Sequence, residues 1–356
     1  MKRELELLEK LSNINGPSGH EDFVRKAMRE EFLKTVSEND ITYDGLRSMI
    51  VKKGNKGPKI MLAAHMDEVG FIVKEITDKG FIKFQTDGDW WSQVILAQQM
   101  TITTRDGKNI CGVTGSLPPH ILTNNDLKNP VIIDDMYIDL GVSSKEEVEK
   151  LGIKIGDMIT PTMKFKTMNN ENYLMGKALD NRAGCAAIIR ILEELKDVDH
   201  PNTVYAVGTV QEELGFRGAE TSAKMINPDI AIAFDTSVAR DTPGTDGVTA
   251  IGKGPGLLIY EKRLIDHVAL RNLFVQVAEE MSIPFQYDYI KSSTDAGAMS
   301  LTHDGCPAIS VCIETRYLHC HTSVIHKDDY ENAIKLVLEV IKRLDQETVD
   351  RITYDE

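Results

Sequence analysis

Hydrophobic positions near the start of the chain recur with the spacing of a helix. Leu7, Leu11 and Ile14 fall on one face of a first predicted helix. The segment Ser18–Glu21 then has the pattern of a capping box, in which a Ser and a Glu satisfy the free backbone N–H groups where a helix begins. We therefore expect a second helix to start directly after this segment.

Between residues 69 and 161 the pattern changes to short apolar runs separated by Gly, Asp and Pro turns. Little helical periodicity occurs there, so the runs predict strands. The predicted strands are Phe71–Ile76, Phe81–Phe84, Met100–Thr104, Asn109–Val113 and Met158–Pro161. We interpret 69–161 as a small all-β, barrel-like domain inserted into a larger domain made of 1–68 and 162–356.

In the larger domain, predicted strands alternate with predicted helices. The strands are 49–53, 59–64, 203–210, 229–234 and 308–313, and the later helices are 183–198, 265–281 and 327–346. Such alternation predicts a three-layer α/β/α domain with a mixed, largely parallel sheet. In sheets of this kind, the active site lies beyond the carboxyl ends of the strands.

Composition and charge limit the kinds of partner that this protein is expected to bind. The 356 residues carry 41 basic and 55 acidic side chains, a net charge of −14, which disfavours nucleic acid and anionic membranes as partners. No apolar run approaches the roughly 18 residues of a membrane span. The five cysteines have no paired spacing, and the charged amino terminus does not resemble a signal peptide. These features predict a cytoplasmic protein with reduced thiols.

Metal-binding side chains follow several of the predicted strands. They are His65 and Asp67 after 59–64, Glu212 and Glu213 after 203–210, Asp235 after 229–234, His319 after 308–313, and Asp180 before the helix at 183. Clustered carboxylates would repel one another unless cations lay between them. The mixed nitrogen and oxygen donors suit two divalent ions, with Zn²⁺ favoured and Co²⁺ or Mn²⁺ as alternatives.

Five motifs at these positions resemble one family. They are His65-Met-Asp-Glu-Val-Gly70, Ala178-Leu-Asp-Asn-Arg-Ala-Gly184, Gln211-Glu-Glu-Leu-Gly-Phe-Arg-Gly218, Ala233-Phe-Asp235 and Thr315-Arg-Tyr-Leu-His319. In order and spacing they resemble the glutamyl and deblocking aminopeptidases, co-catalytic metallopeptidases that include the tetrahedral aminopeptidases. The resemblance implies a metal-dependent enzyme that removes amino-terminal residues from short peptides.

The resemblance also implies a role for each residue. The implied ligands are Asp180 as a carboxylate bridging two metals, His65 and Asp235 on one metal, and Glu213 and His319 on the other. Glu212 would be the general base that takes a proton from the bridging water, and Asp67 would accept a hydrogen bond from the free ring nitrogen of His65. Neighbouring side chains of a strand point to opposite faces, so Glu212 and Glu213 can share a site only if the strand ends there.

The sequence predicts the substrate preference and the assembly of the protein less directly than it predicts the reaction. Resemblance at Arg316–His321 and Leu344–Asp350 suggests a glutamyl preference, for which a cation is needed, while a leucine-type apolar pocket stays open. The candidate cations are Lys253, Lys262, Arg263 and Lys291. The resemblance further implies a homo-oligomer, with the β domain forming a dimer that builds a tetrahedral dodecamer.

Two other functions and several residues stay open. A glycoside hydrolase needs two carboxylates and no metal, which would leave both His residues without a function. A non-catalytic metal-binding paralogue is disfavoured because Glu212 is present with every ligand candidate. Trp90 and Trp91 fit the β-domain core or an interface. The sequence assigns no role to His120, Asp295, Cys320 or His321.

Overall fold

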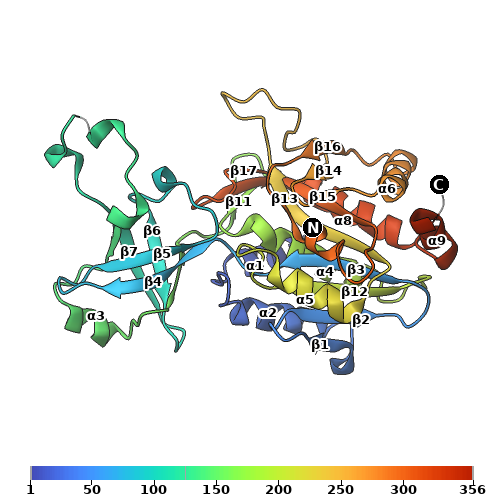
Figure 1. The fold of residues 1–356 in the computed structure, drawn as a ribbon, viewed down its shortest axis with the longest axis horizontal. Helices are drawn as coiled ribbons and strands as arrows, with labels where there is room; N and C mark the ends of the chain where they lie inside the picture. Colours follow the sequence, from blue (N-terminus) through green and yellow to red (C-terminus); the bar gives the residue numbers. More distant parts are fainter. Residues whose placement is uncertain (1, 125, 355–356) are drawn as a thin grey trace.

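The computed structural model describes residues 2–124 and 126–354, and a mixed sheet of twelve strands forms its larger part (Figure 1). The main strand order is β1-β2-β12-β3-β13-β17-β18-β11-β10, and β14 joins β17 to β15 and β16. The strands are β1 Ile41–Tyr43, β2 Met49–Lys53, β3 Lys59–His65, β10 Lys166–Thr167, β11 Tyr173–Gly176, β12 Thr203–Thr209, β13 Ile230–Val238, β14 Gly256–Glu261, β15 Leu264–Ile265, β16 Gln286–Tyr289, β17 Ala308–Arg316 and β18 Ser323–His326.

The four central strands of this sheet, β12, β3, β13 and β17, are parallel, and antiparallel strands flank them. The carboxyl ends of β3 and β12 lie in register, since His65 pairs with Thr209, while β13 and β17 remain paired as far as Val238 and Thr315. The expected mixed sheet with a parallel centre is confirmed. Its carboxyl edge brings together segments that are far apart in the sequence.

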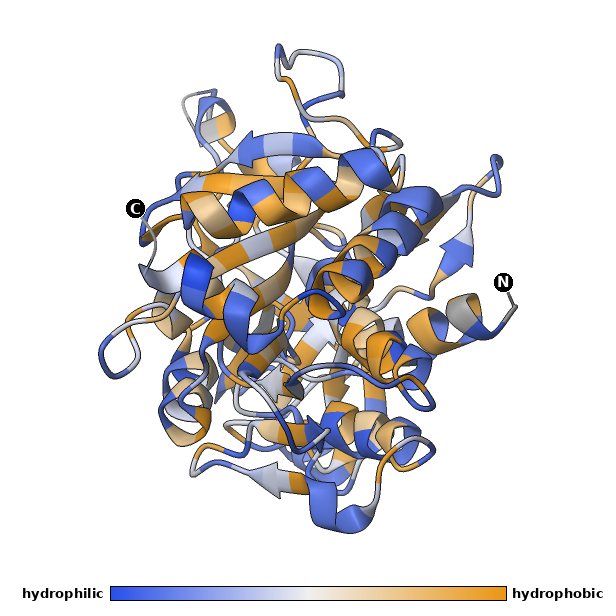
Figure 2. Cartoon of the chain, turned by 90° about the vertical axis from the view of Figure 1, so that its right-hand side faces the viewer, coloured by the Kyte–Doolittle hydropathy of each residue, from blue (hydrophilic) through white to orange (hydrophobic). Residues whose placement is uncertain are grey.

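Helices cover both faces of the sheet. Ile60, Leu62 and Ala64 of β3 pack into one buried cluster, and the alternate residues Met61 and Ala63 pack into another on the opposite face. The helices of the first cluster are α1 Lys2–Ser12, α2 Asp22–Phe32, α4 Leu179–Glu194, α6 Val268–Glu280, α8 Lys327–Ile341 and α9 Gln346–Tyr354. Those of the second are α5 Arg217–Ile226 and α7 Asp295–Met299. The helices turn hydrophobic residues toward the sheet and polar residues outward (Figure 2), which completes the expected three layers.

A closed barrel lies apart from the sheet (Figure 1) and forms its own core around Phe71, Phe84, Ile102 and Ile159. Its strands are β4 Gly70–Ile76, β5 Ile82–Asp87, β6 Gln99–Thr103, β7 Asn109–Gly115, β8 Tyr137–Asp139 and β9 Met158–Pro161, joined in the order β4-β5-β8-β7-β6-β9. Helix α3, Lys145–Leu151, packs against it. The barrel-like fold is confirmed, while the division at residues 69 and 161 stays a prediction.

The expected capping box at the start of α2 is wrong. The helix begins at Asp22, and its N-cap residue, Glu21, makes no capping hydrogen bond with its side chain. The carboxylate of Glu21 instead accepts hydrogen bonds from the backbone N–H groups of Gly19 and Gln211, at 2.8 and 3.1 Å. Glu21 therefore contacts the chain just beyond β12.

Two element ends also differ from expectation. The helix expected over 327–346 ends at Ile341, and a separate helix, α9, begins at Gln346, where the Asp345 carboxylate accepts from the N–H of Thr348 at 2.8 Å. The strand expected over 229–234 continues to Val238, which still pairs with Thr315. Among the described residues, no helix is long and apolar enough to cross a membrane.

Candidate metal centre

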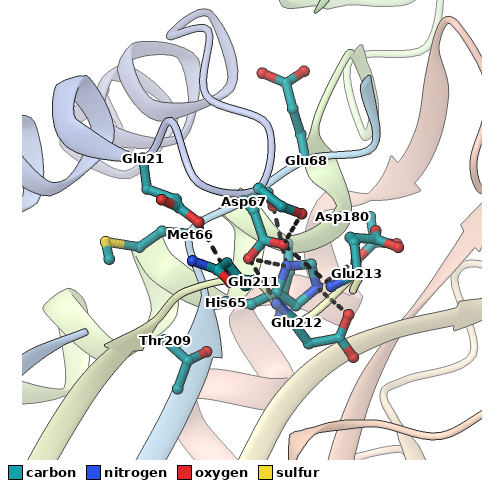
Figure 3. Close-up of polar contacts among 12 residues, drawn as sticks. Glu21, His65, Met66, Asp67, Glu68, Asp180, Thr209, Gln211, Glu212 and Glu213 are labelled. Atoms are coloured by element: carbon teal, nitrogen blue, oxygen red, sulfur yellow. Dashed lines mark hydrogen bonds and ion pairs between the residues drawn. The ribbon is translucent and has the colours of Figure 1, made fainter. Parts of the chain in front are cut away.

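The ends of β3 and β12 place three of the candidate side chains at one point. His65 is the last residue of β3, and β12 ends at Thr209, before Glu212 and Glu213. Gln211 has a left-handed φ of 54°, so the chain turns sharply there. The prediction that the strand ends before the two glutamates is confirmed. Figure 3 shows both beside His65.

The carboxylate of Asp180 lies between the two imidazoles. Its Oδ1 atom is 3.2 Å from Nε2 of His65, and its Oδ2 atom is 3.4 Å from Nε2 of His319. Asp180 lies near the start of α4, where the backbone departs from helical geometry. This placement gives each oxygen a different histidine.

Further carboxylates surround each imidazole. Nε2 of His65 is 3.7 Å from Oδ1 of Asp235 and 3.9 Å from Oε2 of Glu212, and Nε2 of His319 is 3.4 Å from Oε1 of Glu213. Two triads, His65–Asp180–Glu213 and His65–Glu212–Asp235, each place three donor atoms within 4.8 Å of one another. The residues expected from five separate motifs are therefore brought together. Asp235 reaches the site from inside β13 rather than after a strand end.

The electrostatics of this cluster reflect buried negative charge. Burial raises the pKa of Glu213 to about 8 and that of Glu212 well above its ordinary value, and it also raises the pKa of Asp235. Burial opposes protonation of His65, but the carboxylates around it, Glu212 foremost, raise its pKa well above the usual range. Likewise the pKa of His319 is raised to about 10, because the carboxylates of Glu213 and Asp180 outweigh the opposing effect of burial.

The donor set fits divalent cations. Oε1 of Glu213 is buried and has no hydrogen-bond partner among the described residues. Two imidazoles and several carboxylates match the ligand preferences of Zn²⁺. The protons that these groups hold in the absence of cations are ones that metal binding would displace.

Both imidazoles are oriented by backbone carbonyl groups. Nδ1 of His65 lies 3.1 Å from the carbonyl oxygen of Asp67, and Nδ1 of His319 lies 3.0 Å from that of Asp89. A carbonyl oxygen only accepts, so Nδ1 carries the proton and Nε2 keeps its lone pair for a metal. The Asp67 carboxylate faces the same ring nitrogen, with its Oδ1 atom 3.7 Å away, so the expected hydrogen bond to it stays a prediction.

The carboxylate of Asp67 holds the glutamate turn instead. Its two oxygens accept from the N–H groups of Glu212 at 3.2 Å and Glu213 at 3.1 Å, and Oδ2 also accepts from the hydroxyl of Ser18 at 2.8 Å. The Asp67 side chain is fully buried, which shields these contacts from water. Asp67 therefore acts on the site through the backbone of its two glutamates.

A pocket of about 500 Å³ opens onto the cluster. Besides the candidate ligands and Glu212, its walls are formed by Asp89, Gly215, Phe216, Thr236, Val238, Ile290, Ser292, Ser293, Thr294 and Leu318. None of the Lys or Arg side chains in the described ranges is part of this lining. The pocket is therefore apolar and hydroxyl-bearing beyond the acidic floor.

Three residues without an assigned role lie outside the ligand cluster. Nε2 of His321 contacts the carbonyl oxygen of Gln99 at 2.9 Å, and Cys320 is half-buried, which raises the pKa of its thiol. Asp295 is buried and accepts from the hydroxyl of Thr209 at 2.6 Å. None of the three lines the pocket over the described residues.

The barrel holds the remaining candidates. Trp90 stacks on Phe71 with ring centroids 4.6 Å apart, which fits the barrel core, whereas Trp91 is exposed. His120 is exposed in a short 3₁₀ helix. The carbonyl group of Asp89 was not predicted, because a backbone acceptor leaves no signature in the residue type.

The family of the chain follows from its sequence as well as its site. Residues 47–336 match the model of the M42 glutamyl aminopeptidases. A putative aminopeptidase, FrvX, of Escherichia coli is 41% identical over 97% of both chains. The glutamyl aminopeptidase of Lactococcus lactis is 34% identical, over 98% of this chain and 99% of its own. The chain therefore belongs to the M42 aminopeptidase family, as the five motifs predicted.

Solved structures agree with this assignment. The TET aminopeptidase of a marine sediment archaeon, Thaumarchaeota archaeon SCGC AB-539-E09, superposes with a TM-score of 0.95 at 40% identity, over 99% of both chains. The TET1 peptidase of Pyrococcus horikoshii gives 0.84 at 30% identity, over 96% of this chain and all of its own, and is described as assembling into a tetrahedron or a large octahedral shell. The family and fold are thus shown together.

Proposed function

We propose that this protein is a metal-dependent aminopeptidase that releases amino-terminal residues from short peptides through a centre of two divalent ions. The observation that carries the proposal is the carboxylate of Asp180, whose two oxygens face two different imidazoles. Zn²⁺ is the favoured ion, with Co²⁺ or Mn²⁺ as alternatives. When bound, such ions polarise a carbonyl group and lower the pKa of water.

The proposed ligands divide between the two imidazoles. Asp180 would bridge, His65 and Asp235 would hold one ion, and Glu213 and His319 the other. This division is supported by distances of 3.2 to 3.7 Å between paired donor atoms. The two Nδ1 atoms, fixed on backbone carbonyl groups, keep each Nε2 atom directed at the centre.

Glu212 would act as the general base. Its carboxylate lines the pocket, and burial raises its pKa well above the ordinary value, which is the direction that favours accepting a proton. It would take a proton from the attacking water and deliver it to the leaving amine. Asp67 would support this step by holding the N–H groups of Glu212 and Glu213.

The pocket favours an uncharged first residue over an acidic one. Phe216, Val238, Ile290 and Leu318 supply apolar walls, and none of the described Lys or Arg residues lines them. The candidate cations therefore lie elsewhere; Arg263, for example, stacks outside the lining on the ring of Phe216 at 5.2 Å. The glutamyl preference expected from resemblance thus has no counter-charge in the pocket, and the leucine-type alternative is the one we propose.

Assembly through the barrel is the proposed quaternary arrangement. Exposed apolar side chains gather on the loop between β7 and β8, which extends away from the barrel (Figure 1). They are Leu117, Ile121, Leu127 and Ile132. A second copy of the chain would cover them, giving a dimer and then a tetrahedral dodecamer of the kind described for the Pyrococcus relative. A monomer in light scattering would contradict this. We retain the cytoplasmic location, supported by five free cysteines.

One experiment tests the chemistry and the preference together. The purified protein is chelated and then given Zn²⁺, Co²⁺ or Mn²⁺ separately before assay on a panel of aminoacyl-anilides. We expect activity only after metal addition, with leucyl substrates ahead of glutamyl ones. Activity on a glucan that resists chelation would instead favour the glycoside hydrolase.

A further inference from the structure

Three consecutive backbone N–H groups just beyond β12 are held by carboxylates from elsewhere in the chain. Glu21 accepts from Gln211 at 3.1 Å, and Asp67 accepts from Glu212 at 3.2 Å and Glu213 at 3.1 Å. Figure 3 shows Glu21 reaching Gln211 from the start of α2. The turn that carries the proposed base and one proposed ligand is therefore held along its whole length.

This turn needs such support because its backbone is unfavourable. Gln211 has a φ of 54° without being glycine, a conformation that costs a side-chain-bearing residue about 1–2 kcal/mol. Glu21 is buried, so its hydrogen bond to Gln211 is shielded from competing water. Loss of this contact would leave the Gln211 N–H without its partner and free the turn to relax.

The segment that carries Glu21 is itself anchored. Its neighbour Ser18 donates to Asp67 at 2.8 Å, and the carbonyl groups of Ile14 and Gly16 accept from the buried guanidinium of Arg182 at 2.8 and 3.1 Å. Arg182 lies two residues after Asp180, in the same helix. The segment thus connects the start of α4 with the glutamate turn. Glu21 contacts that turn from a segment that is itself held in place.

We propose that Glu21 is a positioning residue, which holds the turn 211–213 so that Glu212 and Glu213 face the metal centre. The inference rests on the proposed function for its effect on turnover, but its geometry is independent of that function. A shift of about 1 Å in a reacting group can cost about 10²-fold in rate. Glu21 touches neither the pocket nor the ligand atoms, so it acts only through the turn.

Four variants test this inference. Glu21→Ala removes the acceptor, Glu21→Asp shortens it by one methylene, and Glu21→Gln retains a carbonyl oxygen that can still accept. Glu30→Ala is the matched control, because Glu30 lies in α2, the helix that begins directly after Glu21, and has an exposed side chain. Each is assayed on leucyl-anilide with saturating Zn²⁺, and amide hydrogen exchange is followed by mass spectrometry in the metal-free protein.

For Glu21→Ala and Glu21→Asp we expect kcat to fall about 10- to 100-fold with KM changed less than about threefold. The Zn²⁺ dissociation constant should rise about tenfold, because Glu213 lies on the same turn. Amides of residues 211–213 should exchange faster, whereas those of β3 should not. Glu21→Gln and Glu30→Ala should behave as the wild type.

The outcomes separate the two proposals. Folded Glu21→Ala and Glu21→Asp proteins with unchanged exchange at 211–213 and unchanged kcat would overturn the positioning role. If Glu21→Ala does not fold, Glu21→Asp decides. A wild-type protein without peptidase activity would instead overturn the proposed function, and the exchange measurement would still test Glu21.

Discussion

The metal centre and the Glu68 cluster lie close together and both bury carboxylates, but they balance the charge differently. In the Glu68 cluster, made of Glu68, Lys177 and Arg182, both carboxylate oxygens accept from the Lys177 ammonium, at 2.6 and 2.7 Å. Arg182 lies 3.5 Å from the same side chain. Figure 3 shows Glu68 pointing away from the metal centre.

The metal centre has no Lys or Arg counter-charge among the described residues. The ion pairs of its carboxylates there are with the imidazoles of His65 and His319, and Oε1 of Glu213 has no hydrogen-bond partner. If only the stability of the fold mattered, apolar side chains would be favoured over these buried charges. A buried acidic cluster without Lys or Arg partners, as at the metal centre, therefore favours ligand binding, whereas a cluster that includes its own counter-charge, as around Glu68, is structural.

The largest expected effect is a loss of turnover at the metal centre without a loss of bound metal. Glu212→Gln removes the proposed base and keeps the shape of the side chain. We expect kcat to fall about 10²- to 10⁴-fold, because general-base catalysis contributes that much. Metal content, measured by atomic emission, should stay at two ions per chain. The exposed Glu171→Gln variant is the control, and unchanged turnover in Glu212→Gln would remove Glu212 as the base.

The next effect concerns the Glu68 cluster. Lys177→Met leaves the Glu68 carboxylate buried with only Arg182 and the N–H of Gly16 as partners. Breaking a buried ion pair in this way should lower the free energy of unfolding by about 3–5 kcal/mol, measured with guanidinium. The exposed Lys166→Met variant should change it by less than about 0.5 kcal/mol.

The same measurement on the metal-free centre should give the opposite result. Asp235→Asn removes one charge from a cluster that the chain does not neutralise, so the free energy of unfolding should stay within about 1 kcal/mol or rise. A loss as large as that of Lys177→Met would contradict the proposed difference between the two clusters.

Metal binding provides the third and smaller effect. Zn²⁺ at 100 times its dissociation constant should raise the free energy of unfolding by about 2.7 kcal/mol for each bound ion over the chelated protein. The Lys177→Met variant should gain the same free energy from Zn²⁺, since the Glu68 cluster does not bind the metal. The His319→Ala variant should gain less. An equal gain in His319→Ala would exclude His319 as a ligand.

The fold was largely predictable because its signals are local. The apolar run of β3 and the alternation after residue 162 predicted the parallel centre, and Gly, Asp and Pro turns predicted the barrel strands. The errors fall where a side chain makes a distant contact. Glu21 has the spacing of a capping residue but bonds to Gln211, and no local pattern reports a partner 190 residues away.

The site was predictable in its residue types and only partly in its contacts. Predicted strand ends and one predicted helix start located all of the candidate side chains, and resemblance implied their separate roles. The bond from His65 to the Asp67 carbonyl oxygen, and the absence of a described cation in the pocket, depend on how loops fold back. Residue spacing carries no information about either.

The comparison extends to a third kind of buried carboxylate, which has neither a paired counter-charge nor a ligand site beside it. Glu314 of β17 is fully buried, and neither of its oxygens has a hydrogen-bond partner among the residues described. Burial raises its pKa to about 9, helped by Asp288 and Asp329 and opposed by Arg240. Glu314 therefore balances its charge by staying protonated.

This state makes the last predicted effect a pH slope. The pKa of Glu314 is higher in the folded protein than in the unfolded chain, about 4.5, so its contribution to stability is complete below pH 4.5 and is lost as pH rises toward 9. Glu314→Gln keeps the shape and cannot ionise. Chelated wild type should therefore lose up to about 1.4 kcal/mol per pH unit more than the variant across this window, measured by guanidinium unfolding at each pH. Parallel profiles for the two proteins would mean that Glu314 is ionised in the fold, and its charge would then need a cation just as the metal centre does.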